Sequence, residues 1–336
     1  MNSFFIDLPG KFLLATLTLA VGQFGVQANE TPDDTPAQVR ELRLQGKLEA
    51  AQSLAEKTIF ETGISPGEAF DIRLELARIY DRFGLHFRSR PVLAALDEID
   101  TATKLAADLG DVYEARAKLA RANYYYRAEM SERKFPTAIQ LLNESLRLFP
   151  VSNFHDRAEA VHLQGLIHLQ MRELDLAREL FDESLRLDIQ GGARVFFLGE
   201  YERHVAFVFI FQDNPSEAIP HLERSLDARI EAGAIDASLF AANTLASQQL
   251  ALGNLDAIPA LLEYSESVLE NLDSPYGEYQ YLMINGRFRD EIKDHCQSSE
   301  IYRRAEIVAG SINWDAGLRQ ADEYQENAEQ LAEDCT

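Results

Sequence analysis

Three histidines, His155, His162 and His168, lie close together in the chain and have the side chains best suited to bind a metal ion. His155 and His162 are seven residues apart, a spacing that places two side chains on one face of a helix. We expect His155 to precede that helix, however, and His168 to pack between helices. No HExxH, CxxC or acidic calcium loop accompanies them. The pattern therefore predicts no metal site, and no nucleotide-binding fingerprint indicates a cofactor.

Two Glu-Ser pairs, Glu144-Ser145 and Glu183-Ser184, resemble the catalytic Glu-Ser of helical solenoid enzymes that cleave peptidoglycan. A general acid needs apolar surroundings that raise its pKa, and the exposed side of a helix offers none. The two pairs also occur in the same register of a repeat, with Ser as a small packing residue, which indicates a structural role. No GxSxG motif is present. We therefore predict that the protein is not an enzyme and has no catalytic residue, and we keep peptidoglycan cleavage as a disfavoured alternative.

The composition excludes some classes of partner. The chain of 336 residues has a formal net charge of −23 and is 46% hydrophobic, enough to form a core. Nucleic acid and anionic lipid surfaces require a basic face, which this balance of charges disfavours.

The first 28 residues have the pattern of a secretion signal. Lys11 precedes the apolar run 12–21, and Ala28 provides a small residue before a predicted cleavage site. The run is too short to span a bilayer comfortably, although an uncleaved membrane anchor is the competing interpretation. We expect a periplasmic or secreted protein with no stable membrane insertion after cleavage.

The only cysteines, Cys296 and Cys335, both lie near the C-terminus. In an exported protein they are expected to form one disulfide bond that ties the last helix to the preceding one. Two unrelated thiols are the alternative.

The rest of the chain has a helical pattern, because apolar residues recur three and four positions apart from Ala37 onward. The segment 141–148 nearly repeats at 180–187, 39 residues later, and Ser225 follows Ser184 by 41 residues. A period of about 40 residues is typical of stacked helical repeats. We predict an all-α protein in which antiparallel helix pairs form a solenoid.

The clearest unit, at about 158–188, resembles a tetratricopeptide repeat (TPR). Like the other units, it has small or aromatic residues where paired helices cross. The units follow one another at a spacing similar to the repeat length of the longer TPR variants, about 40 residues. The resemblance implies a right-handed solenoid, packed through Ala138, Gly165, Ala177, Phe181, Ser184 and Ala218. The predicted divisions are a signal peptide (1–28), a polar linker (29–36), a TPR-like array (37–275) and a C-terminal helical cap (276–336).

In TPR arrays the first helix of each pair lines a concave groove that binds ligands. Carried over to this chain, the resemblance implies a partner-binding groove with Asn123, Tyr124, Arg127, His162, Arg203, His204, Phe207 and Asn243. Arginine suits a carboxylate, and aromatic residues suit an interface. We expect an exported scaffold that binds a segment of another cell-envelope protein or peptide. A sensor for a small molecule or glycan is the alternative.

Overall fold

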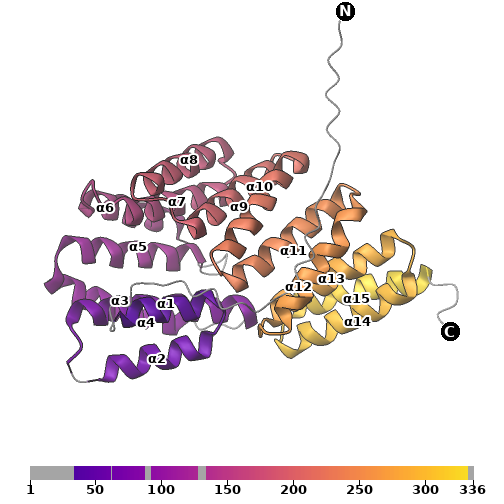
Figure 1. Cartoon of the computed structure of the whole chain (residues 1–336), viewed down its shortest axis with the longest axis horizontal. Helices are drawn as coiled ribbons and strands as arrows, with labels where there is room; N and C mark the ends of the chain where they lie inside the picture. The colour runs from indigo at the N-terminus through magenta and orange to yellow at the C-terminus, as the bar shows by residue number, and fades with distance from the viewer. Residues whose placement is uncertain (1–33, 62, 88–91, 128–133, 332–336) are drawn as a thin grey trace, which may run out of the picture. The chain divides into compact units, whose positions relative to one another are not determined.

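The computed structural model describes residues 34–61, 63–87, 92–127 and 134–331, and all regular elements in these ranges are helices (Figure 1). The elements are α1 (Thr35–Leu44), α2 (Leu48–Phe60), α3 (Pro66–Phe87), α4 (Val92–Leu109), α5 (Asp111–Arg127), α6 (Phe135–Leu148), α7 (Phe154–Gln170), α8 (Leu174–Gln190), α9 (Val195–Phe211), α10 (Pro215–Glu231), α11 (Ile235–Ala251), the 3₁₀ helix η1 (Leu255–Ala257), α12 (Ile258–Leu269), α13 (Pro275–Glu291), α14 (His295–Ser311) and α15 (Asp315–Leu331).

Consecutive helices pack as pairs, from α1 with α2 to α13 with α14, and α15 packs against α14 (Figure 1). The predicted all-α solenoid of stacked helix pairs is confirmed. Pro259 lies in the first turn of α12, which follows the 3₁₀ helix η1. Proline is tolerated there, since the first turn of a helix has no partner for its N–H groups.

The backbone repeats with the period seen in the sequence. The turns within four successive pairs have one residue with a positive φ, at Arg172, Asp213, Gly253 and Lys293. These residues are 41, 40 and 40 positions apart. A left-handed residue after a helix lets the chain reverse sharply, so the next helix packs against the one just ended.

Small residues lie where paired helices cross. A Cβ atom on Gly165 would lie 2.6 Å from Phe181 Cε1 and 3.3 Å from the carbonyl oxygen of Ala177, so only glycine fits against α8 at this distance. Gly286 has the same relation to Tyr302, because a Cβ atom on it would overlap the tyrosine ring. All six residues assigned to repeat packing are buried, namely Ala138, Gly165, Ala177, Phe181, Ser184 and Ala218.

Helix α5 differs in register from the 39-residue shift of the sequence repeat, which would put Tyr126 at the position of Gly165. Ser145 donates a hydrogen bond to the carbonyl of Ala115, just as Ser225 does to the carbonyl of Gly199. This equivalence puts Ala122, which is fully buried, at the position of Gly165. The connection between α5 and α6 is longer than the one between α7 and α8, and this shifts α5 by one helical turn.

Helices from the two ends of the array touch. Helix α3 contacts α13, and α1 contacts α11. In the turn between α1 and α2, a Cβ atom on Gly46 would lie 2.5 Å from Leu272 Cδ1. The repeat pattern did not predict this contact.

Three predictions concern residues outside the described ranges. The signal peptide and most of the polar linker precede Asp34, and Cys335 follows the last described residue, so its pairing with Cys296 stays a prediction. Among the helices that the structure describes, none is both long and apolar enough to cross a membrane.

Candidate functional site

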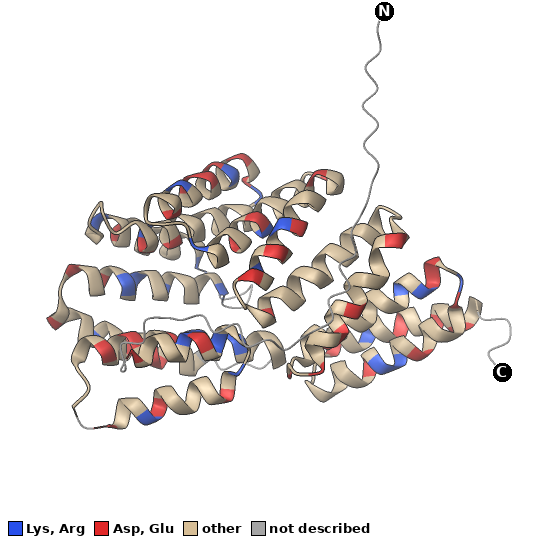
Figure 2. Cartoon of the chain, in the orientation of Figure 1, with Lys and Arg blue, Asp and Glu red and all other residues tan. Residues whose placement is uncertain are grey.

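Charged side chains from distant helices meet on α1, α3, α7, α9 and α11, with one residue each from α8, from α10 and from the connection before α9. The resulting set, which we call the inner cluster, contains seven arginines and five carboxylates. Its members are Arg40, Arg43, Glu75, Arg78, Arg82, Glu159, Asp188, Arg194, Glu200, Arg203, Arg229 and Asp236. In Figure 2 basic and acidic residues lie next to one another on α1 and α9. A surplus of arginine in this cluster contrasts with the net charge of −23 for the whole chain.

Glu75 of α3 binds three arginines. Its carboxylate accepts hydrogen bonds from Arg40 Nε at 3.2 Å, from Arg43 Nε at 3.0 Å and from Arg78 Nη1 at 2.6 Å. Burial alone would raise the pKa of Glu75, but the three cations outweigh burial and lower the pKa to about 2. The carboxylate therefore stays ionised and joins α1 to α3.

Arg78 connects α3 to α7 at a point that water still reaches. Its Nη2 lies 3.6 Å from Glu159, which also accepts a hydrogen bond from Arg194 at 2.8 Å. Arg78 keeps 38% of its side chain exposed, so this part of the cluster borders solvent. Charged groups of a ligand could therefore contact it.

Arg203 of α9 is the arginine of the inner cluster that has no carboxylate within ion-pair distance among the described residues. Its neighbour Glu200 pairs instead with Arg229, whose Nη2 donates a hydrogen bond at 2.6 Å. The Nε of Arg203 is buried without a hydrogen-bond partner, although the side chain as a whole is partly exposed. Burial and the nearby Arg229 lower the pKa of Arg203 to about 10, so it remains a cation at neutral pH.

Ser274, His86 and Asp236 form a chain of contacts with the residue types of a hydrolase triad. His86 Nδ1 lies 2.6 Å from Ser274 Oγ, and its Nε2 lies 3.5 Å from Asp236 Oδ2. All three residues are buried, and Ser274 Oγ also accepts the N–H of Gly277 at the start of α13. A nucleophile must reach its substrate, so this arrangement supports a structural role that links α3, α11 and α13.

His162 and His204, two of the residues predicted to line the groove, form a buried pair. His162 Nε2 lies 2.9 Å from His204 Nδ1, and the His162 ring packs against Phe181 and Phe197. Burial lowers the pKa of His162 to about 4, and burial together with His162 lowers the pKa of His204. Both rings are therefore neutral at neutral pH and pack between helix pairs.

The other predicted groove residues differ in exposure. Asn243 is buried, where it donates to the Gly277 carbonyl and accepts from Ser265. Arg127 is exposed, with Nε 3.5 Å from Asp81, and Asn123 donates to the same carboxylate at 3.4 Å. The remaining two, Tyr124 and Phe207, are half-buried.

The predicted groove thus divides into a buried set and an accessible set. The first contains His162, His204 and Asn243, and the second contains Asn123, Tyr124, Arg127, Arg203 and Phe207. The ion pairs of α3 were missed, because residues Glu75, Arg78 and Arg82 lie in a unit whose sequence hardly resembles the repeat. Their spacing of three and four residues was the available signal.

The Glu-Ser pairs lack the environment of a general acid. Hydrogen bonding from Lys118 lowers the pKa of Glu144, whereas a proton donor would need a raised pKa. Ser145 and Ser184 are fully buried at helix crossings. In the described part of the chain, no three His, Cys, Asp or Glu side chains are arranged to hold a metal ion.

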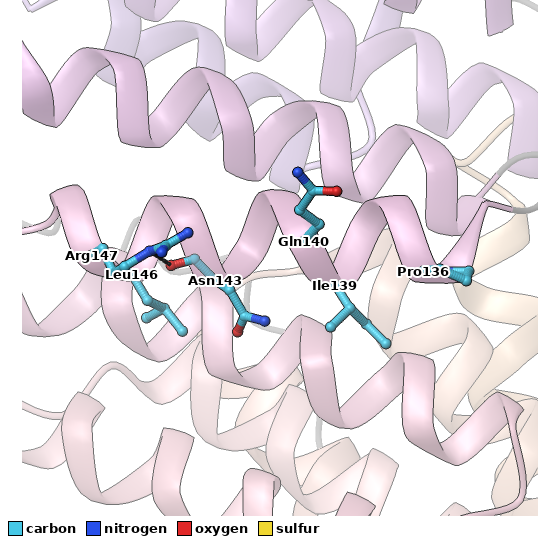
Figure 3. A pocket seen from close by; sticks show the side chains of 6 residues that line it. All are labelled: Pro136, Ile139, Gln140, Asn143, Leu146 and Arg147. Carbon is cyan, nitrogen blue, oxygen red and sulfur yellow. Dashed lines mark hydrogen bonds between the residues drawn. The ribbon is translucent and has the colours of Figure 1, made fainter.

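A shallow hollow of 630 Å³ runs along α6 (Figure 3). It is lined by Pro136, Ile139, Gln140, Asn143, Leu146 and Arg147, all from this one helix. A ligand site usually draws polar groups from several elements, so the inner cluster is the stronger candidate.

Comparison with known proteins identifies the fold and not a close relative. No protein-family model matches the chain, and no curated protein is detectably similar in sequence. A Rap protein in complex with competence and sporulation factor aligns with 90% of this chain and 86% of its own, at 13% identity and a TM-score of 0.61.

Two further solved structures are similar in fold. A signal-transduction ATPase with numerous domains, a protein of Pyrococcus horikoshii with a tetratricopeptide-repeat sensor, aligns over 91% of this chain but 46% of its own, at 14% identity and a TM-score of 0.62. Aspartyl phosphate phosphatase F from Bacillus subtilis aligns over 89% of this chain and 93% of its own, at 10% identity and a TM-score of 0.50. The chain therefore has the fold of TPR solenoids.

Proposed function

We propose that this protein, a solenoid with the TPR fold, is an exported scaffold that binds a segment of another cell-envelope protein. The segment would contact the accessible groove residues and present an acidic group to Arg203. Support comes from the fold, since one similar structure is of a Rap protein in complex with competence and sporulation factor. Periplasmic or secreted location is part of the proposal and follows from the predicted signal peptide.

The single observation that carries the proposal is the unpaired charge of Arg203. An arginine that is partly removed from water and lacks a carboxylate has an unfavourable free energy. The chain has 55 acidic residues, yet none of the described ones lies within ion-pair distance of this guanidinium. A carboxylate from a partner would supply the missing charge-assisted hydrogen bonds. The half-buried ring of Phe207, which lies 4.9 Å from the guanidinium, would add apolar contact area.

Site-specific photo-crosslinking in the native cell envelope tests the proposal. A photoreactive phenylalanine analogue replaces Phe207 in one variant and Ile189, which is 57% exposed on α8, in another. We expect one discrete protein to be crosslinked from position 207 and not from position 189. Adding R127A and R203A should abolish that crosslink, whereas R147A with R186A, two exposed arginines outside the inner cluster, should leave it intact.

Two outcomes would contradict the proposal. The two positions could give the same crosslinked proteins, or the R127A/R203A variant could crosslink as well as the parent. A melting curve shows whether the R127A/R203A variant is folded, because R127A removes the contact with Asp81, whereas Arg203 has no ion pair to lose. If no protein is crosslinked and small polar ligands raise the melting temperature, the sensor alternative is favoured.

A further inference from the structure

The contact between the two ends of the array is formed mainly by polar groups. Arg82 of α3 reaches Asp236 of α11 at 3.4 Å, and His86 lies between Asp236 and Ser274. Its apolar contacts include Leu272 beside Gly46 and Phe240, whose ring centroid lies 5.6 Å from that of His86. We call this set of contacts, made by Gly46, Arg82, His86, Asp236, Phe240, Leu272 and Ser274, the end junction.

No apolar cluster in the described ranges spans the end junction. Each of the eight clusters holds residues from neighbouring helices, and none combines residues of α1–α4 with residues of α11–α13. Burial of apolar surface supplies most of the free energy that holds helices together. The end junction therefore has less of the interaction that stabilises the helix pairs of the array.

The polar groups of the end junction are also incompletely paired. His86 Nε2 and both carboxylate oxygens of Asp236 are buried without a hydrogen bond that meets normal geometry. A buried polar atom without a partner loses its hydration and gains little in return. Opening the junction to water would recover that hydration, so the free energy of opening is smaller than for any neighbouring helix pair.

We propose that the array opens and closes at the end junction while its helix pairs stay folded. Opening would separate α1 and α3 from α11 and α13 and uncover the Arg82 and Asp236 side of the inner cluster. A partner segment would enter through this opening, and closure would hold it against Arg203. Opening itself requires no partner, whereas its link to binding rests on the proposed function.

Hydrogen–deuterium exchange of the full chain tests the opening without any ligand. We expect the amides of residues 82–87 and 274–279 to exchange faster, under native conditions, than the amides of residues 158–167, which lie in the middle of α7. The variant R82M leaves the Asp236 carboxylate without its cation, which should accelerate exchange in both segments on the order of tenfold or more. The control R303M breaks an exposed ion pair within α14 and should change neither segment.

A disulfide bond across the end junction provides the opposite perturbation. In a G46C/L272C variant the oxidised form should slow exchange in both segments, and reduction should restore it. The proposed opening is contradicted if the amides of both segments exchange only when the whole array unfolds. It is also contradicted if R82M accelerates amide exchange in α7 by the same factor.

The same variant separates the opening from the proposed function. If the oxidised form loses the crosslink from position 207 and the reduced form regains it, the junction is the entry route. An undiminished crosslink in the oxidised form would overturn that route while leaving the scaffold function standing. Absence of any crosslink in the parent would instead count against the scaffold function, with the exchange results unaffected.

Discussion

At the scale of single residues, the closest contacts are those of the glycines at helix crossings. We predict that G165A lowers the free energy of unfolding by about 1–3 kcal/mol, because its new methyl group would overlap the Phe181 ring. Gly310 is the matched control, since it is also helical but a Cβ there meets only Leu318, at 3.7 Å. G310A should stabilise α14 by about 0.5–1 kcal/mol, the usual gain from alanine over glycine. Urea unfolding of both variants measures the difference. Equal changes in the free energy of unfolding would contradict the conclusion that Gly165 is required for the close crossing of α7 and α8.

The histidine pair predicts how stability depends on pH. The folded protein holds His162 neutral down to about pH 4, whereas in the unfolded chain it binds a proton below about 6.5. The free energy of unfolding should therefore fall as the pH drops from 6.5 to 4; His162 contributes about 3 kcal/mol to this fall, and the lowered pKa of His204 acts in the same direction. Unfolding in urea at pH 7 and pH 5 tests this, with H162L/H204L expected to show a weaker dependence.

At the scale of the element, the turns within helix pairs predict a stabilising substitution. Lys293 has a φ of 66°, which costs a residue with a side chain about 1 kcal/mol relative to glycine. K293G should therefore raise the midpoint of thermal unfolding. G253A puts a side chain at φ 73° in the equivalent turn and should lower the midpoint, although the space around it is open. Melting curves that moved in the same direction for both would contradict this account of the turns.

The sequence predicted the helix pairs well because their signals are local. Apolar periodicity and the spacing between Ser184 and Ser225 depend only on residues within about 40 positions of each other. The register of α5 was wrong, since a longer connection moved Ala122 into the position assigned to Tyr126. The repeat pattern also did not predict which groove residues are buried and which are exposed. His162 and Arg203 hold equivalent places in α7 and α9, yet the first is buried by Phe181 and Phe197 and the second borders solvent.

At the scale of the whole array, the meeting of its ends was not predictable from any repeat. Each repeat turns by a small angle relative to the last, and only the sum of these rotations determines whether α3 reaches α13. Arg82 and Asp236 are 154 positions apart, and neither belongs to a motif. The contact between Arg82 and Asp236 could be identified only from the three-dimensional structure.

The distribution of charge predicts how the array responds to salt. Most of the acidic surplus lies on the surface, where like charges repel one another and destabilise the folded state. Buried pairs such as Glu75 with Arg43 are shielded from ions, so salt weakens them little. Raising the ionic strength from 0.01 to 0.15 M shortens the screening length from about 30 to about 8 Å. We therefore expect the melting temperature to rise by on the order of a few degrees, measured by circular dichroism. A fall would mean that exposed ion pairs such as Arg303 with Glu300 contribute more to stability than surface repulsion subtracts.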